Sequence, residues 1–304
     1  SLLMSTDTVM APFFASALYF HHRILETRAP RFALMAGASI GLAFMAKYAA
    51  VYFLIGVALA AVLRRDQRIS WGNAVLSLSA CLLVISPNLI WNLTHQMTTF
   101  SHTADNVGWV RRDNPFAGLH AAGLVEFLVS QFAVVGPIVF AALLIGLRKP
   151  GPGAGLWPFI VPPIAVVSIQ ALLGEAQANW AISAYFAGTL LAVAVLADHR
   201  HWMAASLAIN AALCLAMALL VIFPTISLDG KQPLLDRQLG RAAMSRQIID
   251  LAHENGDLPI YVTRRDVLAD LFYTGHDAEL TIFAPRRADR PKNHYEQRYP
   301  LPAG

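Results

Sequence analysis

The chain has 304 residues, of which 56% are hydrophobic and only 14% are charged. Soluble domains carry about 25% charged residues to cover their surface, so this composition excludes an ordinary soluble protein as well as a disordered one. Together with a mean hydropathy of +0.50, it predicts a membrane protein.

Charge is distributed unevenly along the chain. Residues 1–226 contain 12 Lys and Arg against 8 Asp and Glu, whereas residues 227–304 contain 11 of each. We therefore predict a transmembrane helical domain over residues 1–225 and a module of ordinary soluble composition over residues 226–304, with the boundary near Pro224. The excess of basic residues belongs to the membrane part, where such residues set orientation, so nucleic acid is not expected as a partner.

A membrane-spanning helix needs about 20 apolar residues. Apolar runs of this kind cover residues 8–24, 32–63, 73–91, 124–147, 156–173, 180–197 and 202–223. The second run holds 32 residues with Lys47 in its middle, which is too long for one crossing. Two short crossings with Lys47 at the turn avoid a charge at the bilayer centre, which costs about 2.5–3.5 kcal/mol.

The positive-inside tendency supports this division into eight crossings. With two crossings over residues 32–63, the three arginines before this run and the three after it fall on the same side, together with those near residues 148 and 200. The cytoplasmic loops then hold nine basic residues, whereas the short connections on the other side hold only Lys47, Arg111 and Arg112. The C-terminal module is predicted on this other, extracytoplasmic side.

Polar residues that are far apart in the sequence gather on the extracytoplasmic face in this arrangement. Ionisable groups at the membrane are costly to retain, so their grouping indicates a functional site. The candidates are Asp7, Lys47, Asn88, Asn92, His95, His102, Glu175 and Asn179.

Each candidate also has a purely structural interpretation. Lys47 could be a snorkelling anchor, and Asp7 could be the N-cap of the first helix. The two asparagines around Pro87 could satisfy backbone groups at a kinked helix end, and the two histidines could be ordinary loop residues rather than metal ligands. Glu175 and its neighbours could form an interfacial cap.

The C-terminal module reads as a small α/β unit. An amphipathic helix is expected over residues 236–255, a strand over 259–263, a helix over 264–273 and a second strand over 280–284, which favours a parallel strand pair. A Gly-rich phosphate loop is absent from this sequence, so nucleotide binding is not supported. A cap over the extracytoplasmic face would suit this module.

Several segments resemble the bacterial members of glycosyltransferase family 39. The resemblance is carried, in order, by residues 5–14 (STDTVMAPFF), 41–48 (GLAFMAKY), 86–92 (SPNLIWN), 99–106 (TFSHTADN), 178–180 (ANW), 270–273 (DLFY) and 293–295 (NHY). This family includes relatives of the dolichyl-phosphate-mannose protein mannosyltransferases and of the aminoarabinose lipid A transferase, and its members share the GT-C fold. The resemblance implies an all-α polytopic bundle of the GT-C type.

The resemblance also implies an activity. It implies transfer of a sugar from a polyprenyl-phosphate donor to a lipid, glycan or protein acceptor on the periplasmic face of the bacterial inner membrane. Lys47 would stabilise the departing lipid phosphate, Asp7 and Glu175 would make supporting contacts to sugar hydroxyls or to a divalent cation, and the remaining candidates would bind substrate. The family's acidic catalytic motif has no match here, so we expect it to lie in a segment that precedes Ser1.

Two other functions remain open from the sequence. A transporter or flippase also gathers polar residues within a helix bundle, and residues 158–163, with three prolines, are a candidate for the broken helix such proteins use. A non-catalytic membrane remnant or scaffold is the other alternative.

Overall fold

The computed structural model describes residues 5–95, 97–107, 119–148, 155–227, 233, 239–278, 280–288 and 291–303, without the side chains of residues 102 and 104–107. It consists of two compact units, Ser1–Cys214 and Leu215–Gly304, which we describe separately. Their division falls within the long helix α10 (Arg200–Ile222), upstream of the boundary expected from composition. Only Ser206 of this helix is buried.

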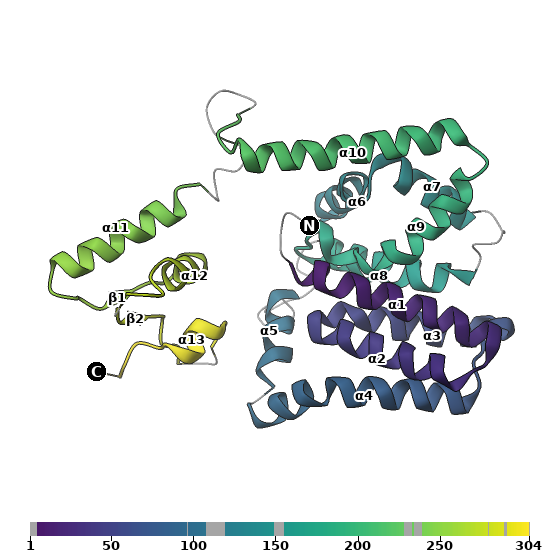
Figure 1. The fold of residues 1–304 in the computed structure, drawn as a ribbon, viewed down its shortest axis with the longest axis horizontal. Helices are drawn as coiled ribbons and strands as arrows, with labels where there is room; N and C mark the ends of the chain where they lie inside the picture. Colours follow the sequence, from purple (N-terminus) through teal and green to yellow (C-terminus); the bar gives the residue numbers. More distant parts are fainter. Residues whose placement is uncertain are drawn as a thin grey trace. The chain divides into compact units, whose positions relative to one another are not determined.

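Four long helices form the first half of the larger unit (Figure 1). They are α1 (Thr6–Thr27), α2 (Pro30–Ala46), α3 (Val51–Leu63) and α4 (Trp71–Thr94). Local capping begins two of them: the side chains of Ser5 and Ser70 accept backbone N–H groups in the first turns of α1 and α4. Helix α2 packs between α1 and α4.

The long apolar run is interrupted at Lys47. Helix α2 ends there in extended backbone, with φ −160° and ψ 133°, and a 3-10 turn over Tyr48–Ala50 leads into α3. Lys47, which precedes α3, is bound to Asp7 in the first turn of α1. Beyond the far end of α3, Ile69 packs against the buried cluster that contains Ile24, close to the C-terminal end of α1. The chain therefore reverses direction at Lys47, which confirms the break that was predicted there.

Glycines let α2 and α4 approach closely. A Cβ atom on Gly37 would lie 2.0 Å from the carbonyl oxygen of Ser77, and one on Gly41 would lie 2.7 Å from Cβ of Val84. The Ser77 hydroxyl also donates to the carbonyl of Ala33 at 2.9 Å. This spacing of small residues is the arrangement by which helices associate in membranes, where apolar surface alone gives little preference between lipid and protein.

The second half contains α6 (Ala121–Val134), α7 (Pro137–Arg148), α8 (Trp157–Leu173) and α9 (Ser183–Leu196). A 3-10 turn, η4 (Ala178–Ala181), joins α8 to α9. The expected single helix over residues 124–147 is in fact two helices bent by 112°. The cause is local: Gly136 has φ +95°, and Pro137, which has no N–H to donate, starts the next helix.

The loops that connect the helices of the larger unit lie at two ends of that unit. At one end, the Asn73 side chain donates to the carbonyl of Arg28 at 3.0 Å, and a Cβ on Gly155 would lie 3.3 Å from Gln67. At the other end, the N–H of His120 donates to the carbonyl of Leu172 at 2.8 Å. The first end holds three loops that were predicted to be cytoplasmic, and the side of the membrane on which they lie stays a prediction.

Helix length and exposure are those of a membrane protein. By length and composition, α4 and α10 could each cross a membrane, and the bent pair α6–α7 would make a third span among the described residues. In each of α4 and α10, only 6% of the apolar 18-residue stretch is buried within the protein. Apolar helix surfaces of this extent require lipid or another apolar partner. Four further apolar helices have 10–17 residues, so eight crossings stay a prediction.

The smaller unit includes α11 (Arg241–Glu254), β1 (Ile260–Tyr261), α12 (Arg265–Thr274), β2 (Ile282–Phe283) and α13 (His294–Arg298). The two strands are parallel, with Ile260 opposite Ile282. Ile249, Leu268, Leu271, Ile282 and Ala284 form its buried core. Helices α11 and α12 are also joined by an ion pair between Arg241 and Asp266 at 2.9 Å.

Candidate functional site

An ion pair lies where α1 and the break after α2 meet. The Lys47 ammonium donates to Oδ1 of Asp7 at 2.5 Å, and the two residues are 40 positions apart. The side chain of Asp7 is 9% exposed and that of Lys47 is 22% exposed. Ser5, not Asp7, caps α1, so the carboxylate in the first turn is free to bind Lys47. Lys47 is therefore a paired cation rather than an isolated snorkelling anchor.

Asn179 completes this group from the second half of the unit. Its side-chain amide donates to Oδ2 of Asp7 at 2.7 Å, across 172 positions of sequence. Both oxygens of the Asp7 carboxylate thus accept a hydrogen bond, one from a cation and one from a neutral amide. Hydrogen bonds to an ionised group are short and strong, so these two fix the geometry of the carboxylate.

A second polar group lies beside the first. The Tyr48 hydroxyl donates to Oδ1 of Asn88 at 2.9 Å, and the Asn92 amide donates to the backbone carbonyl of Asn88 at 2.9 Å. Oδ1 of Asn92 accepts the N–H of Thr99 at 3.0 Å, which attaches the start of α5 (Thr98–Val107) to the end of α4. Asn92 is completely buried, so its role here is structural.

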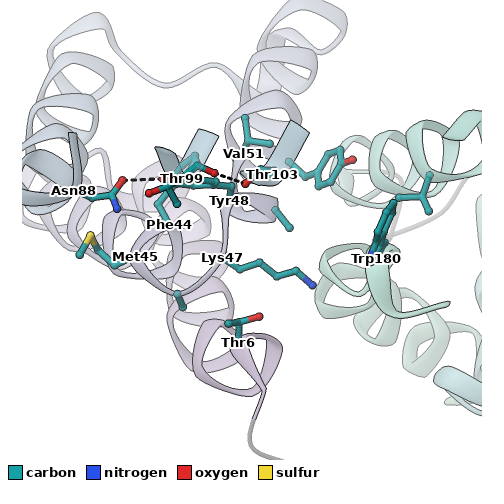
Figure 2. Close-up of a pocket in the computed structure, with 14 residues that line it drawn as sticks. Thr6, Phe44, Met45, Lys47, Tyr48, Val51, Asn88, Thr99, Thr103 and Trp180 are labelled. Atoms are coloured by element: carbon teal, nitrogen blue, oxygen red, sulfur yellow. Dashed lines mark hydrogen bonds between the residues drawn. The ribbon is translucent and has the colours of Figure 1, made fainter. Parts of the chain in front are cut away.

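Members of both groups border a cavity of about 590 Å³ (Figure 2). Its wall combines polar side chains with aromatic and aliphatic ones. The lining residues used below are Lys47, Tyr48, Asn88, Thr99, Thr103 and Trp180. Figure 2 shows the Lys47 side chain extending away from its own helix toward the side on which Trp180 lies, while the hydroxyl of Tyr48 is directed to Asn88. Among the described residues, the cavity lining therefore offers one cation, several hydroxyl groups, the amide of Asn88 and apolar surface.

Three predicted site residues are not joined to this group. His95 is exposed and stacks on Trp91, with ring centroids 4.4 Å apart, and its Nδ1 atom lies 2.9 Å from the Trp91 carbonyl. The side chain of Glu175 is exposed on the loop before η4. The side chain of His102 lies outside the described residues, although its backbone belongs to α5.

Tyr48, Trp180 and Gln131 were missed as site residues from the sequence. Tyr48 and Trp180 follow directly after the candidates Lys47 and Asn179, so adjacency was a usable signal for them. Gln131 lies inside an apolar helix, and a glutamine there is itself a signal, because a buried amide needs hydrogen-bond partners.

The donor set does not favour a metal centre. Among the residues that the structure describes, there is no group of three or more His, Cys, Asp or Glu side chains that could hold a metal ion. Asp7 already accepts hydrogen bonds at both of its oxygens. The arrangement suits the binding of an anion by Lys47 and of hydroxyl groups by the neighbouring amides and threonines.

Two comparisons with known proteins show which family the chain is similar to. Residues 1–91 match the family model described as dolichyl-phosphate-mannose-protein mannosyltransferase. The whole chain is 36% identical, over 314 aligned positions, to the lipid A galacturonosyltransferase RgtD of Rhizobium johnstonii. These matches support a bacterial glycosyltransferase that is similar to members of family 39.

Two further facts limit what these matches show about the chain. The chain spans 65% of the length of RgtD, so it corresponds to part of that relative. No solved structure matches the chain. The family 39 match over residues 1–91 includes Asp7, Lys47 and Asn88, whereas Asn179 lies outside that match and within the alignment to RgtD.

Proposed function

We propose that this chain is the substrate-binding core of a membrane glycosyltransferase that moves a sugar from a polyprenyl-phosphate donor to a lipid acceptor on the periplasmic face of a bacterial inner membrane. Similarity to family 39 glycosyltransferases supports glycosyl transfer, and the apolar helices support a location in the membrane. The observation that carries the proposal is Lys47, a cation held by Asp7 at the edge of an apolar-walled cavity.

Lys47 would bind the lipid phosphate of the donor. As the bond between the sugar and the phosphate breaks, negative charge grows on the phosphate oxygens, and a nearby ammonium stabilises that charge more in the transition state than in the ground state. Since Asp7 is mostly buried and paired, it would orient the ammonium rather than serve as the base. Asp7 is therefore a positioning residue in this proposal.

The acceptor hydroxyl must lose a proton as it attacks the sugar. Within the described site, both oxygens of Asp7 are engaged, which makes it a poor proton acceptor. We assign that role to the acidic motif that the family carries on an external loop, and we assign contacts with sugar hydroxyls to Asn88 and Asn179, whereas the exposed Glu175 has no place in this part of the proposal.

The apolar part of the cavity would hold the first units of the polyprenyl tail. Exposing such a tail to water costs about 0.8 kcal/mol per CH2 group, so the enzyme must bring its cation to the membrane interface. The cavity wall meets this need, because Phe44, Val51 and Val167 line it beside Lys47. RgtD is a lipid A galacturonosyltransferase by name, and by analogy we propose a lipid A-type glycolipid as the acceptor and a uronic acid as the sugar.

The test compares Lys47→Ala with Lys47→Arg in the full-length protein, reconstituted with a radiolabelled polyprenyl-phosphate sugar and a lipid A acceptor. We expect Lys47→Ala to lower kcat/KM at least about 100-fold, the usual cost of removing one group that stabilises transition-state charge. Lys47→Arg keeps the charge and should retain part of the activity.

Arg65→Ala is the matched control, because Arg65 is an exposed cation in the loop after α3. This variant should transfer sugar at the wild-type rate. Wild-type turnover by Lys47→Ala would overturn the proposed role of Lys47. Movement of the intact donor across the bilayer without sugar transfer would instead favour a flippase.

A further inference from the structure

We propose that Gln131 is a positioning residue that holds the η4 turn, so that Asn179 can reach the Asp7 carboxylate. Its contribution to catalysis rests on the function proposed above, whereas its effect on the turn can be measured without any activity. Gln131 itself does not line the cavity.

The hydrogen bonds of Gln131 carry this proposal. Gln131 lies on α6 and is completely buried. Its amide nitrogen shares two N–H donors among the carbonyl of Phe127 at 2.8 Å, the hydroxyl of Ser130 at 3.1 Å and the carbonyl of Ala178 at 3.2 Å. Its Oε1 atom accepts the hydroxyl of Tyr185 at 2.6 Å. A buried amide is costly unless its polar atoms are paired, and here the pairing reaches two other elements.

The bond to Ala178 acts on the residue next to Asn179. Ala178 begins the four-residue turn η4, which is otherwise closed by local bonds such as Trp180 N–H to the Gln177 carbonyl at 3.0 Å. A single 3-10 turn has little stability of its own, because its hydrogen-bond geometry is poor. An anchor from a neighbouring helix therefore decides where the Asn179 side chain lies.

Packing supplies a second anchor on the same helix. Trp180 packs against a buried cluster that includes Phe127 of α6 and Val167 of α8. The turn is thus held to α6 by one polar and one apolar contact, one on each side of Asn179. From Asn179 the contacts continue to Asp7 at 2.7 Å and then to Lys47 at 2.5 Å. Loss of the hydrogen bond from Gln131 to Ala178 would therefore displace Asn179 and, through Asp7, change the position of the Lys47 ammonium.

The first experiment measures the turn directly. Hydrogen–deuterium exchange of peptides covering residues 176–182 is compared in the full-length protein, in detergent, for wild type, Gln131→Leu and Tyr185→Phe. We expect Gln131→Leu to speed exchange in this segment about tenfold, because the turn loses its anchor. Tyr185→Phe leaves the bond from Gln131 to Ala178 intact and should exchange within about twofold of wild type.

Asn73→Leu is the matched control for burial. Asn73 is also a buried amide that donates to a backbone carbonyl, that of Arg28 at 3.0 Å, but among loops far from the cavity. It should leave exchange of residues 176–182 unchanged. The proposal is overturned if Gln131→Leu exchanges like wild type, or if Tyr185→Phe speeds exchange as much as Gln131→Leu, since that would show general packing of α6 against α9.

The second experiment asks whether Gln131 acts through Asn179. In the transfer assay, Gln131→Leu and Asn179→Ala should each lower kcat/KM for the lipid donor about tenfold. The loss in the double variant should be no greater than the larger of the two single losses. Multiplicative losses would show independent action and would overturn this path. An inactive wild-type protein would count against the proposed function alone, while the exchange result would still decide the role of Gln131.

Discussion

His21 is a buried polar side chain that the proposed chemistry does not use. It lies on α1 against both Phe53 and Phe159, with ring centroids 5.9 Å from each, and its Nε2 atom has no hydrogen-bond partner among the described residues. An unpaired buried nitrogen costs about 1–3 kcal/mol, whereas each edge-on aromatic contact contributes about 0.5–1.5 kcal/mol, and a leucine at this position removes the polar atom while it keeps apolar contact with both rings. We expect His21→Leu to stabilise the protein by about 1 kcal/mol, seen as a higher midpoint of thermal unfolding in detergent.

The neighbouring histidine is the control for this residue. The side chain of His22 is 66% exposed, and its Nε2 atom lies 3.2 Å from a carboxylate oxygen of Glu26. Because exposed ion pairs contribute little, His22→Leu should change the free energy of unfolding by less than about 0.5 kcal/mol. A lower midpoint for His21→Leu would mean that the ring contacts outweigh the unpaired nitrogen.

At the scale of elements, the close approach of α2 and α4 depends on Gly37. A methyl group there would lie 2.0 Å from the Ser77 carbonyl oxygen, and neither backbone can yield without separating the helices. We expect Gly37→Ala to cost at least about 2 kcal/mol of stability, as over-packing of a tight interface does. Steric-trap or thermal unfolding in detergent would measure the loss.

Gly72 offers the matched substitution on α4. A Cβ added there meets nothing within 4 Å, so Gly72→Ala should be neutral or stabilise the helix by up to about 1 kcal/mol. Equal stability of the Gly37→Ala and Gly72→Ala variants would contradict the tight α2–α4 contact.

At the scale of the whole molecule, the two ends of the larger unit should face opposite sides of the membrane. Reporter fusions near Arg65 and Arg148 should report a cytoplasmic location, and fusions near Arg111 and Gln247 a periplasmic one. The positive-inside tendency is the physical reason, because the predicted cytoplasmic loops hold nine basic residues. Fusions at Arg65 and Arg111 that report the same side would divide the predicted site between the two leaflets.

The sequence by itself determined the features that depend on local composition. Hydropathy located the apolar helices, and the charge inside one long run placed the break at Lys47, because a lone ammonium is too costly at the centre of a bilayer. The Gly136-Pro137 pair is a sequence signal for the bend. The apolar run around it nevertheless favoured one continuous helix, and that prediction was wrong. The segments STDTVMAPFF and GLAFMAKY, which include Asp7 and Lys47, also indicate a resemblance to family 39 from the sequence alone.

Only the tertiary structure decided which polar residues meet. Asp7 binds Lys47, which is 40 positions away in the sequence, and Asn179, which is 172 positions away. His95 instead contacts the Trp91 carbonyl of the helix that it ends. Hydropathy assigns residues to one face of a membrane but carries no information on their distances within that face. Those distances follow from helix packing, in which Gly37 brings α4 to α2 and Gln131 anchors the turn that carries Asn179.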